Sequence, residues 1–207
     1  MALLDVGHGT GESLVFMLSD PSTPRPSRLV GITSLPLHHE QSKERIAAVQ
    51  SSAQVNLYLG DAVYRSSSIG HPLSPQSEES FDCVLALDCA YHFKTRRDFL
   101  SQSLVKLSPG GRIALADMCF DPHYRWVEKL AEMLIPKENI VSMDQYMLTM
   151  KDIGFAEVEV EDITSNVFPR FLEFLRGKGL QWWIFSSAYG WFLYAMGVKF
   201  VIASGSS

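Results

Sequence analysis

Short runs of apolar, often β-branched residues alternate with longer stretches of helical periodicity, and this alternation restricts the fold more than any other feature of the sequence. Seven runs are expected to be strands: 3–6, 29–33, 55–59, 83–87, 112–117, 156–161 and 198–203. Six segments between them are expected to be helices: 11–18, 42–50, 95–107, 124–134, 143–153 and 169–176. The pattern predicts an α/β protein with a doubly wound, seven-stranded, mostly parallel sheet and helices on both faces.

Length and charge narrow the classes of function. A chain of 207 residues is long enough for one domain with a substantial core, so we expect 1–207 to form a single domain. The formal net charge of −5, without a run of Lys or Arg, argues against nucleic acid as a partner. The three cysteines show no metal-ligand spacing and favour a reducing, cytoplasmic compartment, and no secretory signal is indicated.

A glycine-rich segment, DVGHGTG, lies at positions 5–11 between a predicted strand and a predicted helix. Glycines let the backbone turn sharply and approach a ligand closely, and the helix N-terminus offers free N–H groups. A dinucleotide-binding fingerprint would require a third glycine at position 12, which is Glu12. The spacing argues against a nicotinamide-dependent oxidoreductase and suits a cofactor without phosphate; a glycine-rich turn without a ligand is the alternative.

The D-x-G-x-G-x-G pattern resembles the first motif of class I S-adenosylmethionine-dependent methyltransferases. The segments LVGITSLPLHHEQ, VNLYLGDA, FDCVLALDCAYHF, LSPGGRIALADM and VKFVIASG resemble later family segments in the same order. The resemblance implies a Rossmann-like methyltransferase fold with an antiparallel last strand, and S-adenosyl-L-methionine as the cofactor. It assigns cofactor contacts to Asp5, Gly7, His8, Gly9, Thr10, Gly11, Asp61, Ala62 and Asp88.

The end of the second strand departs from the usual family pattern. Family members usually place Glu or Asp there to accept hydrogen bonds from the ribose, whereas this chain reads Gly31-Ile32-Thr33-Ser34, and a neutral hydroxyl is the weaker acceptor. Together with Gln41, this pattern is similar to the subgroup of sterol, tocopherol and cyclopropane-forming methyltransferases. The resemblance therefore implies cofactor contacts from Thr33 and Gln41 and a small or lipid-like acceptor.

Candidate catalytic residues follow the fourth predicted strand. Asp88, Tyr91 and His92 are expected at the carboxyl edge of the sheet, where doubly wound folds bind ligands. Methyl transfer is a direct displacement that depends mainly on alignment and requires no metal. Because an imidazole titrates near neutral pH in water, His92 is the candidate base for an ionisable acceptor, with Tyr91 beside it. The alternatives are a hydrogen-bonded loop histidine and a packed tyrosine.

Two other features are expected to have no catalytic role. His38 and His39 would point to opposite sides of an extended chain with no third ligand nearby, so we expect both to be exposed rather than metal-binding. Cys89 has no activating partner that the sequence can assign, so we expect it to pack as a small residue.

An uncharged, aromatic segment covers positions 179–198. Three interpretations compete for 179–197: a cap over an apolar acceptor pocket, a segment lying on an intracellular membrane, and a spanning helix. The first two imply a lipophilic acceptor. An aromatic stripe at helical spacing is also common in cores, but here aromatic residues fall on several faces.

Family members usually carry a helical segment before the first strand, where it covers cofactor and acceptor, so this chain resembles a member shortened at its N-terminus. Two hypotheses remain. The first is a methyltransferase that uses S-adenosylmethionine and acts on a small, apolar or lipid-like acceptor. The second is a methyltransferase-like binding or scaffold protein without turnover.

Overall fold

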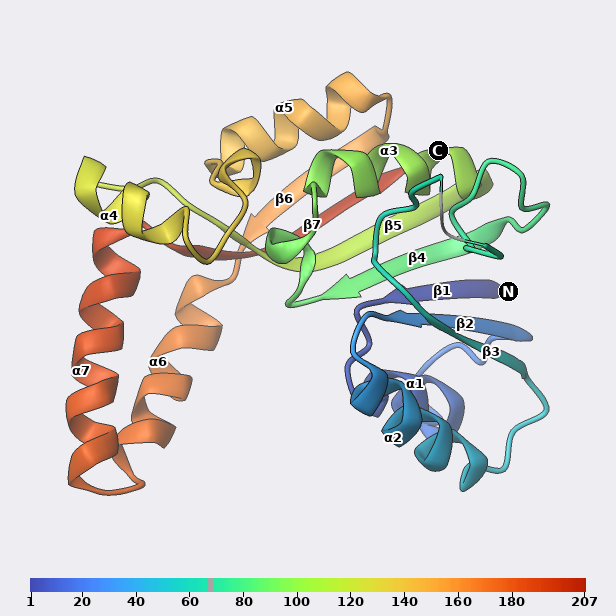
Figure 1. Ribbon diagram of the computed structural model, residues 1–207, viewed down its shortest axis with the longest axis horizontal. Helices are drawn as coiled ribbons and strands as arrows, with labels where there is room; N and C mark the ends of the chain where they lie inside the picture. The colour runs from blue at the N-terminus through green and yellow to red at the C-terminus, as the bar shows by residue number, and fades with distance from the viewer. Residues whose placement is uncertain (67–68) are drawn as a thin grey trace.

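The computed structural model describes residues 1–66 and 69–207, and in this part of the chain seven strands form one sheet (Figure 1). The strands are β1 (Ala2–Val6), β2 (Arg28–Thr33), β3 (Gln54–Leu59), β4 (Phe81–Leu87), β5 (Leu107–Cys119), β6 (Ala156–Asp162) and β7 (Lys199–Ser206). Their order is β3-β2-β1-β4-β5-β7-β6, and β7 is antiparallel to both of its neighbours while the other pairs are parallel. The predicted fold class is confirmed.

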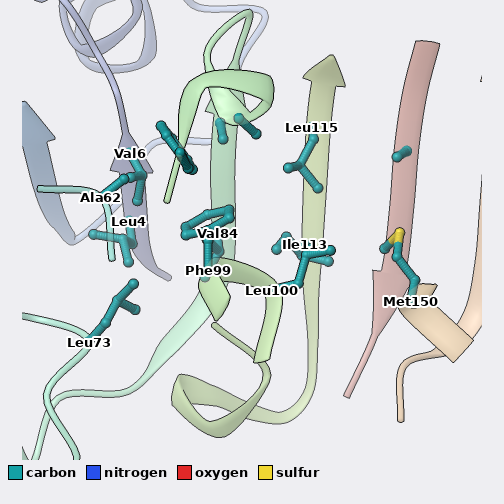
Figure 2. Close-up of a cluster of buried hydrophobic side chains, with 14 of the residues drawn as sticks. Leu4, Val6, Ala62, Leu73, Val84, Phe99, Leu100, Ile113, Leu115 and Met150 are labelled. Atoms are coloured by element: carbon teal, nitrogen blue, oxygen red, sulfur yellow. The ribbon is translucent and has the colours of Figure 1, made fainter. Parts of the chain in front are cut away.

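Helices cover both faces of this sheet. They are α1 (Glu12–Ser19), α2 (Pro36–Ala47), α3 (Arg96–Lys106), α4 (Arg125–Ala131), α5 (Met143–Ile153), α6 (Thr164–Arg176) and α7 (Leu180–Ala195), with short 3-10 turns η1 (Ala90–His92) and η2 (Lys137–Asn139). Neighbouring residues of a strand point to opposite faces, and β1 shows the division. Leu4 belongs to the same buried cluster as Phe99 of α3 and Met150 of α5 (Figure 2), whereas Leu3 belongs to the cluster of Leu14 of α1 on the other face.

The second helix begins earlier than the sequence pattern predicts. We expected a helix at 42–50, but α2 begins at Pro36, whose ring fixes a helical φ at the first position, after Leu35 in extended conformation. His38 and His39 therefore lie on a helix rather than on an extended segment. His38 is exposed, but the expectation that His39 is exposed is wrong, because this side chain is buried.

The third helix follows the predicted punctuation. Thr95 accepts a hydrogen bond from the backbone N–H of Asp98, and the Asp98 side chain accepts one from the backbone of Thr95, so the expected capping box is present. The two bonds satisfy donors that would otherwise be orphaned at the start of α3.

A buried ion pair joins the start of α3 to the carboxyl end of β5. Arg96 Nε lies 2.9 Å from Asp117 Oδ2, and both side chains are almost fully buried. The Arg96 guanidinium also lies over the Tyr146 ring, 4.5 Å from its centre, and donates to the Met118 carbonyl. Burial raises the pKa of Asp117, and the arginine opposes this shift. Asp117 Oδ1 also accepts a hydrogen bond from the backbone N–H of Tyr91 at 3.1 Å, so the pair fixes the loop after β4.

Helices α6 and α7 form a hairpin between β6 and β7 that projects from the carboxyl edge of the sheet (Figure 1). Ser186 is buried between the two helices and donates to the Leu172 carbonyl at 3.0 Å. We expected α6 to begin at Pro169, but it begins at Thr164 and keeps the proline inside. None of the helices in the described part of the chain, α7 included, has the length and hydropathy needed to cross a bilayer.

Candidate active site

A cavity of about 410 Å³ lies at the carboxyl edge of the parallel strands, where β1, β2, β3 and β4 end. Ligands bind at this edge in doubly wound folds. The lining residues come from the loops after these strands and from the start of α2: Gly7, Gly9, Ile32, Thr33, Ser34, Leu35, His38, Gly60, Asp61, Ala62, Cys89, His92, Phe93 and Lys94.

The glycine loop after β1 has a backbone that few other residues could adopt. Gly7, Gly9 and Gly11 have φ values of +82°, +56° and +93°, in the region that disfavours side chains. A Cβ on Gly7 would lie 2.5 Å from Cys89 Sγ, and one on Gly11 would lie 2.9 Å from Ser42 Cβ. A Cβ on Gly9 would meet nothing within 4 Å, so this backbone faces the open space of the cavity.

Two polar side chains, Asp5 in β1 and His8 in the loop, do not line the cavity. Asp5 is buried and accepts a hydrogen bond from Ser13 Oγ at 2.6 Å, and burial raises its pKa to about 6. His8 is 6% exposed, lies against Gly31 of β2, and burial lowers its pKa to about 4. Neither His8 ring nitrogen has a partner among the described residues. The structure therefore gives Asp5 and His8 a supporting position beneath the loop.

The loops after β2 and β3 supply the opposite wall. Thr33 is buried at the end of β2 and lines the cavity. Asp61 follows β3, and its Oδ1 accepts a hydrogen bond from the Val63 N–H at 3.0 Å, which orients the carboxylate at the cavity. Ala62 lines the same wall. Gln41 does not line the cavity, because it lies in the second turn of α2. Thr10, Gly11, Asp88 and Tyr91 do not line it either.

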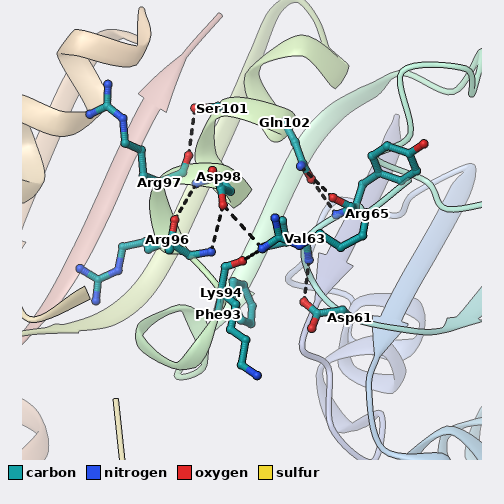
Figure 3. A network of polar contacts seen from close by, with 12 residues as sticks. Asp61, Val63, Arg65, Phe93, Lys94, Arg96, Arg97, Asp98, Ser101 and Gln102 are labelled. Atoms are coloured by element: carbon teal, nitrogen blue, oxygen red, sulfur yellow. Dashed lines mark hydrogen bonds and ion pairs between the residues drawn. The ribbon is translucent and has the colours of Figure 1, made fainter. Parts of the chain in front are cut away.

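Side-chain bonds hold the loop after β3 against α3 and the loop after β4 (Figure 3). The side-chain oxygen of Gln102 accepts a hydrogen bond from the Tyr64 backbone N–H at 2.8 Å, and its side-chain nitrogen donates one to the Tyr64 carbonyl at 3.2 Å. Arg65 donates to the Lys94 carbonyl and lies 3.6 Å from Asp98 Oδ2. Asp61 and His92 therefore belong to segments that are tied to the same helix.

The candidate catalytic residues lie on and around η1. His92 is exposed and lines the cavity, and its ring centre lies 4.2 Å from that of Tyr91. Burial and the nearby Asp88 carboxylate raise the pKa of Tyr91, so this phenol stays protonated at neutral pH. Asp88 has a left-handed backbone with φ of +54°, and partial burial raises its pKa. Of the three residues, the structure brings His92 to the cavity.

Cys89 lies beneath the glycine loop. Its Sγ donates to the Val6 carbonyl at 3.3 Å, and burial raises its pKa above the ordinary value for a thiol. A raised pKa disfavours the thiolate, which is the nucleophilic form. This environment agrees with the expected packing role.

Several lining residues were not predicted as site residues. His38 and Leu35 reach the cavity because α2 begins at Pro36, directly after the loop that follows Thr33. The sequence signal for this early helix start is the proline at position 36, shortly after the end of the second strand, because proline is favoured at the first position of a helix. Phe93 and Lys94 follow His92 along the chain and complete the wall after β4.

A second cavity, of about 640 Å³, lies at the base of the α6–α7 hairpin and shares no lining residue with the first. Much of its wall is apolar, with Phe120, Phe168, Leu172, Leu193 and Val198, and a few charged residues also line it. Phe120 makes an edge-to-face contact with the Tyr91 ring, with 6.2 Å between the ring centres. Tyr91 therefore lies between His92 and an apolar residue of the second cavity.

Comparisons with known proteins agree with the resemblance. Residues 4–115 match a family model described as a methyltransferase domain. The chain is 30% identical over 183 residues to erythromycin 3''-O-methyltransferase of Saccharopolyspora erythraea, covering 83% of this chain and 56% of the relative. It is 24% identical over 182 residues to a probable chloroplastic tocopherol O-methyltransferase of Oryza sativa subsp. japonica, covering 81% of this chain and 46% of the relative. The chain thus spans about half the length of these curated relatives.

A solved structure shows the same fold. Phosphoethanolamine N-methyltransferase 2 of Haemonchus contortus, in complex with S-adenosyl-L-methionine, superimposes with a TM-score of 0.75 at 18% identity. The match covers 100% of this chain and 48% of that chain.

Proposed function

Because the chain belongs to the methyltransferase-domain family of class I S-adenosylmethionine-dependent proteins, we propose that it transfers a methyl group from S-adenosylmethionine to a small, apolar or lipid-like acceptor. Residues 1–207 would act as one domain in the reducing cytoplasm. The observation that carries the proposal is the 410 Å³ cavity, in which the bare backbone of Gly7 and Gly9 faces Thr33 and Asp61 at the carboxyl edge of the sheet.

The residues around the cavity fit this cofactor. The Gly9 backbone leaves room for close approach, and its N–H and that of Ala62 have no partner among the described residues. These donors suit the amino acid carboxylate and the adenine ring, while the Asp61 carboxylate and the Thr33 hydroxyl suit the adenine amino group and the ribose. When bound, S-adenosylmethionine supplies an electrophilic methyl group on a sulfonium sulfur.

The chain's own residues would act mainly by positioning. Direct displacement depends on alignment, and the wall after β4 is fixed by Asp117 and Asn139, which bond the backbone of Tyr91 and Phe93. His92 borders the cavity and would accept the proton of an ionisable acceptor at a ring nitrogen. Because the phenol of Tyr91 stays neutral, Tyr91 would contact the acceptor through its uncharged aromatic ring and would not act as a base.

An apolar acceptor is favoured by the surroundings of His92. The aromatic contact from His92 through Tyr91 to Phe120 leads to the apolar wall of the second cavity. Tyr189 of α7 packs in the same cluster as Tyr91, which supports a role of the hairpin as a cap over the acceptor beside His92. We also propose that 179–197 makes peripheral contact with an intracellular membrane, where such acceptors concentrate.

The first test is calorimetric titration of the purified chain with S-adenosylmethionine and S-adenosylhomocysteine. We expect micromolar binding that is lost in Asp61→Ala and retained in Asp152→Ala, a control in which an exposed aspartate of α5 is removed. Absence of binding by a folded chain would contradict the cofactor assignment. Transfer of labelled methyl to a panel of lipophilic phenols, sterols and fatty acids then separates the enzyme from a binding or scaffold protein, which would bind the cofactor without product.

A further inference from the structure

The tip of the α6–α7 hairpin exposes large apolar side chains on both helices. Between 42% and 76% of each of these residues is exposed: Phe171, Phe174, Leu180, Trp182, Trp183, Ile184 and Phe185. In Figure 1 this tip is the part of the hairpin farthest from the sheet. Contiguous exposed apolar patches of this kind are uncommon on monomeric soluble proteins and mark surfaces that bind another apolar phase.

The apolar residues surround the start of α7 rather than forming one stripe. Successive residues of an α-helix are rotated by about 100°, so the four consecutive residues 182–185 point in all directions around the axis. The next residue, Ser186, is the one buried against α6. A groove on a protein partner covers one side of a helix, whereas a lipid phase surrounds the whole tip.

Basic side chains flank the same tip. Arg170, Arg176 and Lys178 are exposed there with a single acidic residue, Glu173, although the chain as a whole carries a net charge of −5. Lys178 is exposed, and its Nζ lies over the Phe174 ring, 4.5 Å from the ring centre, so the positive charge stands directly beside the apolar side chains of the tip. This local excess of positive charge complements an anionic surface.

We propose that the hairpin tip, residues 170–185, inserts its apolar side chains into the headgroup and acyl boundary of an anionic lipid bilayer, with Arg176 and Lys178 at the headgroups. The proposal rests on the proposed membrane contact of 179–197 and deepens it by naming the inserting tip and the lipid charge. Aromatic residues with flanking basic residues are typical of segments that lie in the membrane interface.

Vesicle co-sedimentation tests the apolar part of the proposal. We expect the chain to bind phosphatidylcholine vesicles containing phosphatidylglycerol, and Phe174→Ala/Trp183→Ala to bind them at least tenfold more weakly. The matched control is Phe16→Ala/Leu148→Ala, which removes two exposed apolar residues of α1 and α5 and should change binding by less than twofold. Equal binding by the tip variant and the control would overturn the proposal.

The charge part has its own variants. A basic residue near an anionic bilayer contributes about a fivefold change in affinity, so Arg176→Gln/Lys178→Gln should weaken binding about 25-fold on phosphatidylglycerol vesicles and hardly at all on pure phosphatidylcholine. Arg25→Gln/Lys129→Gln removes two exposed basic residues elsewhere and should have little effect. Equal weakening by both double variants, or no weakening, would overturn the anionic preference.

Two further readouts separate the possible failures. Light scattering without vesicles shows whether the tip instead joins two copies of the chain; a dimer that the tip variant abolishes, without vesicle binding, would overturn the membrane proposal. Cofactor titration of the same variants should be unchanged. A tip variant that loses vesicle binding but still binds the cofactor shows that the tip itself, and not the overall fold, makes the membrane contact. Vesicle binding by a folded wild-type chain that binds no cofactor would refute the proposed function and leave this inference standing.

Discussion

Replacing Gly7 by alanine should destabilise the protein more than the same change at Gly9. An alanine at either position adopts a positive φ, which costs about 1–2 kcal/mol. At Gly7 the added Cβ would also lie 2.5 Å from Cys89 Sγ and 3.1 Å from Cys89 Cβ. Overpacking of this kind costs about 1–3 kcal/mol more. We therefore expect a loss of about 2–5 kcal/mol for Gly7→Ala and about 1–2 kcal/mol for Gly9→Ala.

Urea unfolding followed by circular dichroism measures both losses. The variant Gly7→Ala/Cys89→Ala should regain part of the loss relative to Cys89→Ala alone, because the sulfur that obstructs the new methyl group is removed. If Gly7→Ala is no less stable than Gly9→Ala, or if the double variant shows no coupling, the close packing of the loop on Cys89 is refuted.

The same pair of variants separates stability from binding. A methyl group on Gly9 meets no protein atom within 4 Å and extends toward the cavity that we assign to the cofactor. Gly9→Ala should therefore lose at least tenfold in affinity for S-adenosylmethionine while remaining folded at 25 °C. Unchanged affinity would show that the cofactor does not approach the backbone of this loop.

Three other changes test the surroundings of the site. The raised pKa of Asp5 means that the folded state binds its proton more tightly than the unfolded state, so the stability of the wild type relative to Asp5→Asn should rise by about 2 kcal/mol from pH 6 to pH 4, and parallel curves for the two proteins in urea titrations would contradict this shift. His8 has a lowered pKa, so Asp5→Asn itself should lose stability as the pH falls from 6.5, and a flat curve for this variant would contradict that shift. Asp117→Ala leaves Arg96 buried without its partner and should cost about 3–5 kcal/mol in urea unfolding, more than Asp117→Leu/Arg96→Met, and an equal loss in both would refute the pairing. His92→Asn should lower methyl transfer about 10²- to 10⁴-fold with cofactor affinity unchanged in calorimetry, and retained turnover would favour the loop-histidine interpretation.

The sequence by itself determined the alternation of strands and helices and the position of the glycine loop. The strand runs are short apolar segments that can only be buried in a sheet, and each was found within a residue or two except at β5 and β7. The capping box at Thr95 was also predictable, because it depends on residues three positions apart. A glycine loop between a strand and a helix is likewise a local feature, since its positive φ values restrict the residue type.

Tertiary structure decided the features that depend on distant partners. β5 begins at Leu107 rather than 112 because Leu107 pairs with Phe81 of β4, and such pairing leaves no local pattern. His39 is buried and Gln41 lies outside the cavity because α2 begins at Pro36 and turns these side chains by helical geometry. Local propensity is set by neighbours along the chain, whereas burial and the walls of a cavity are set by segments that meet only when the sheet forms.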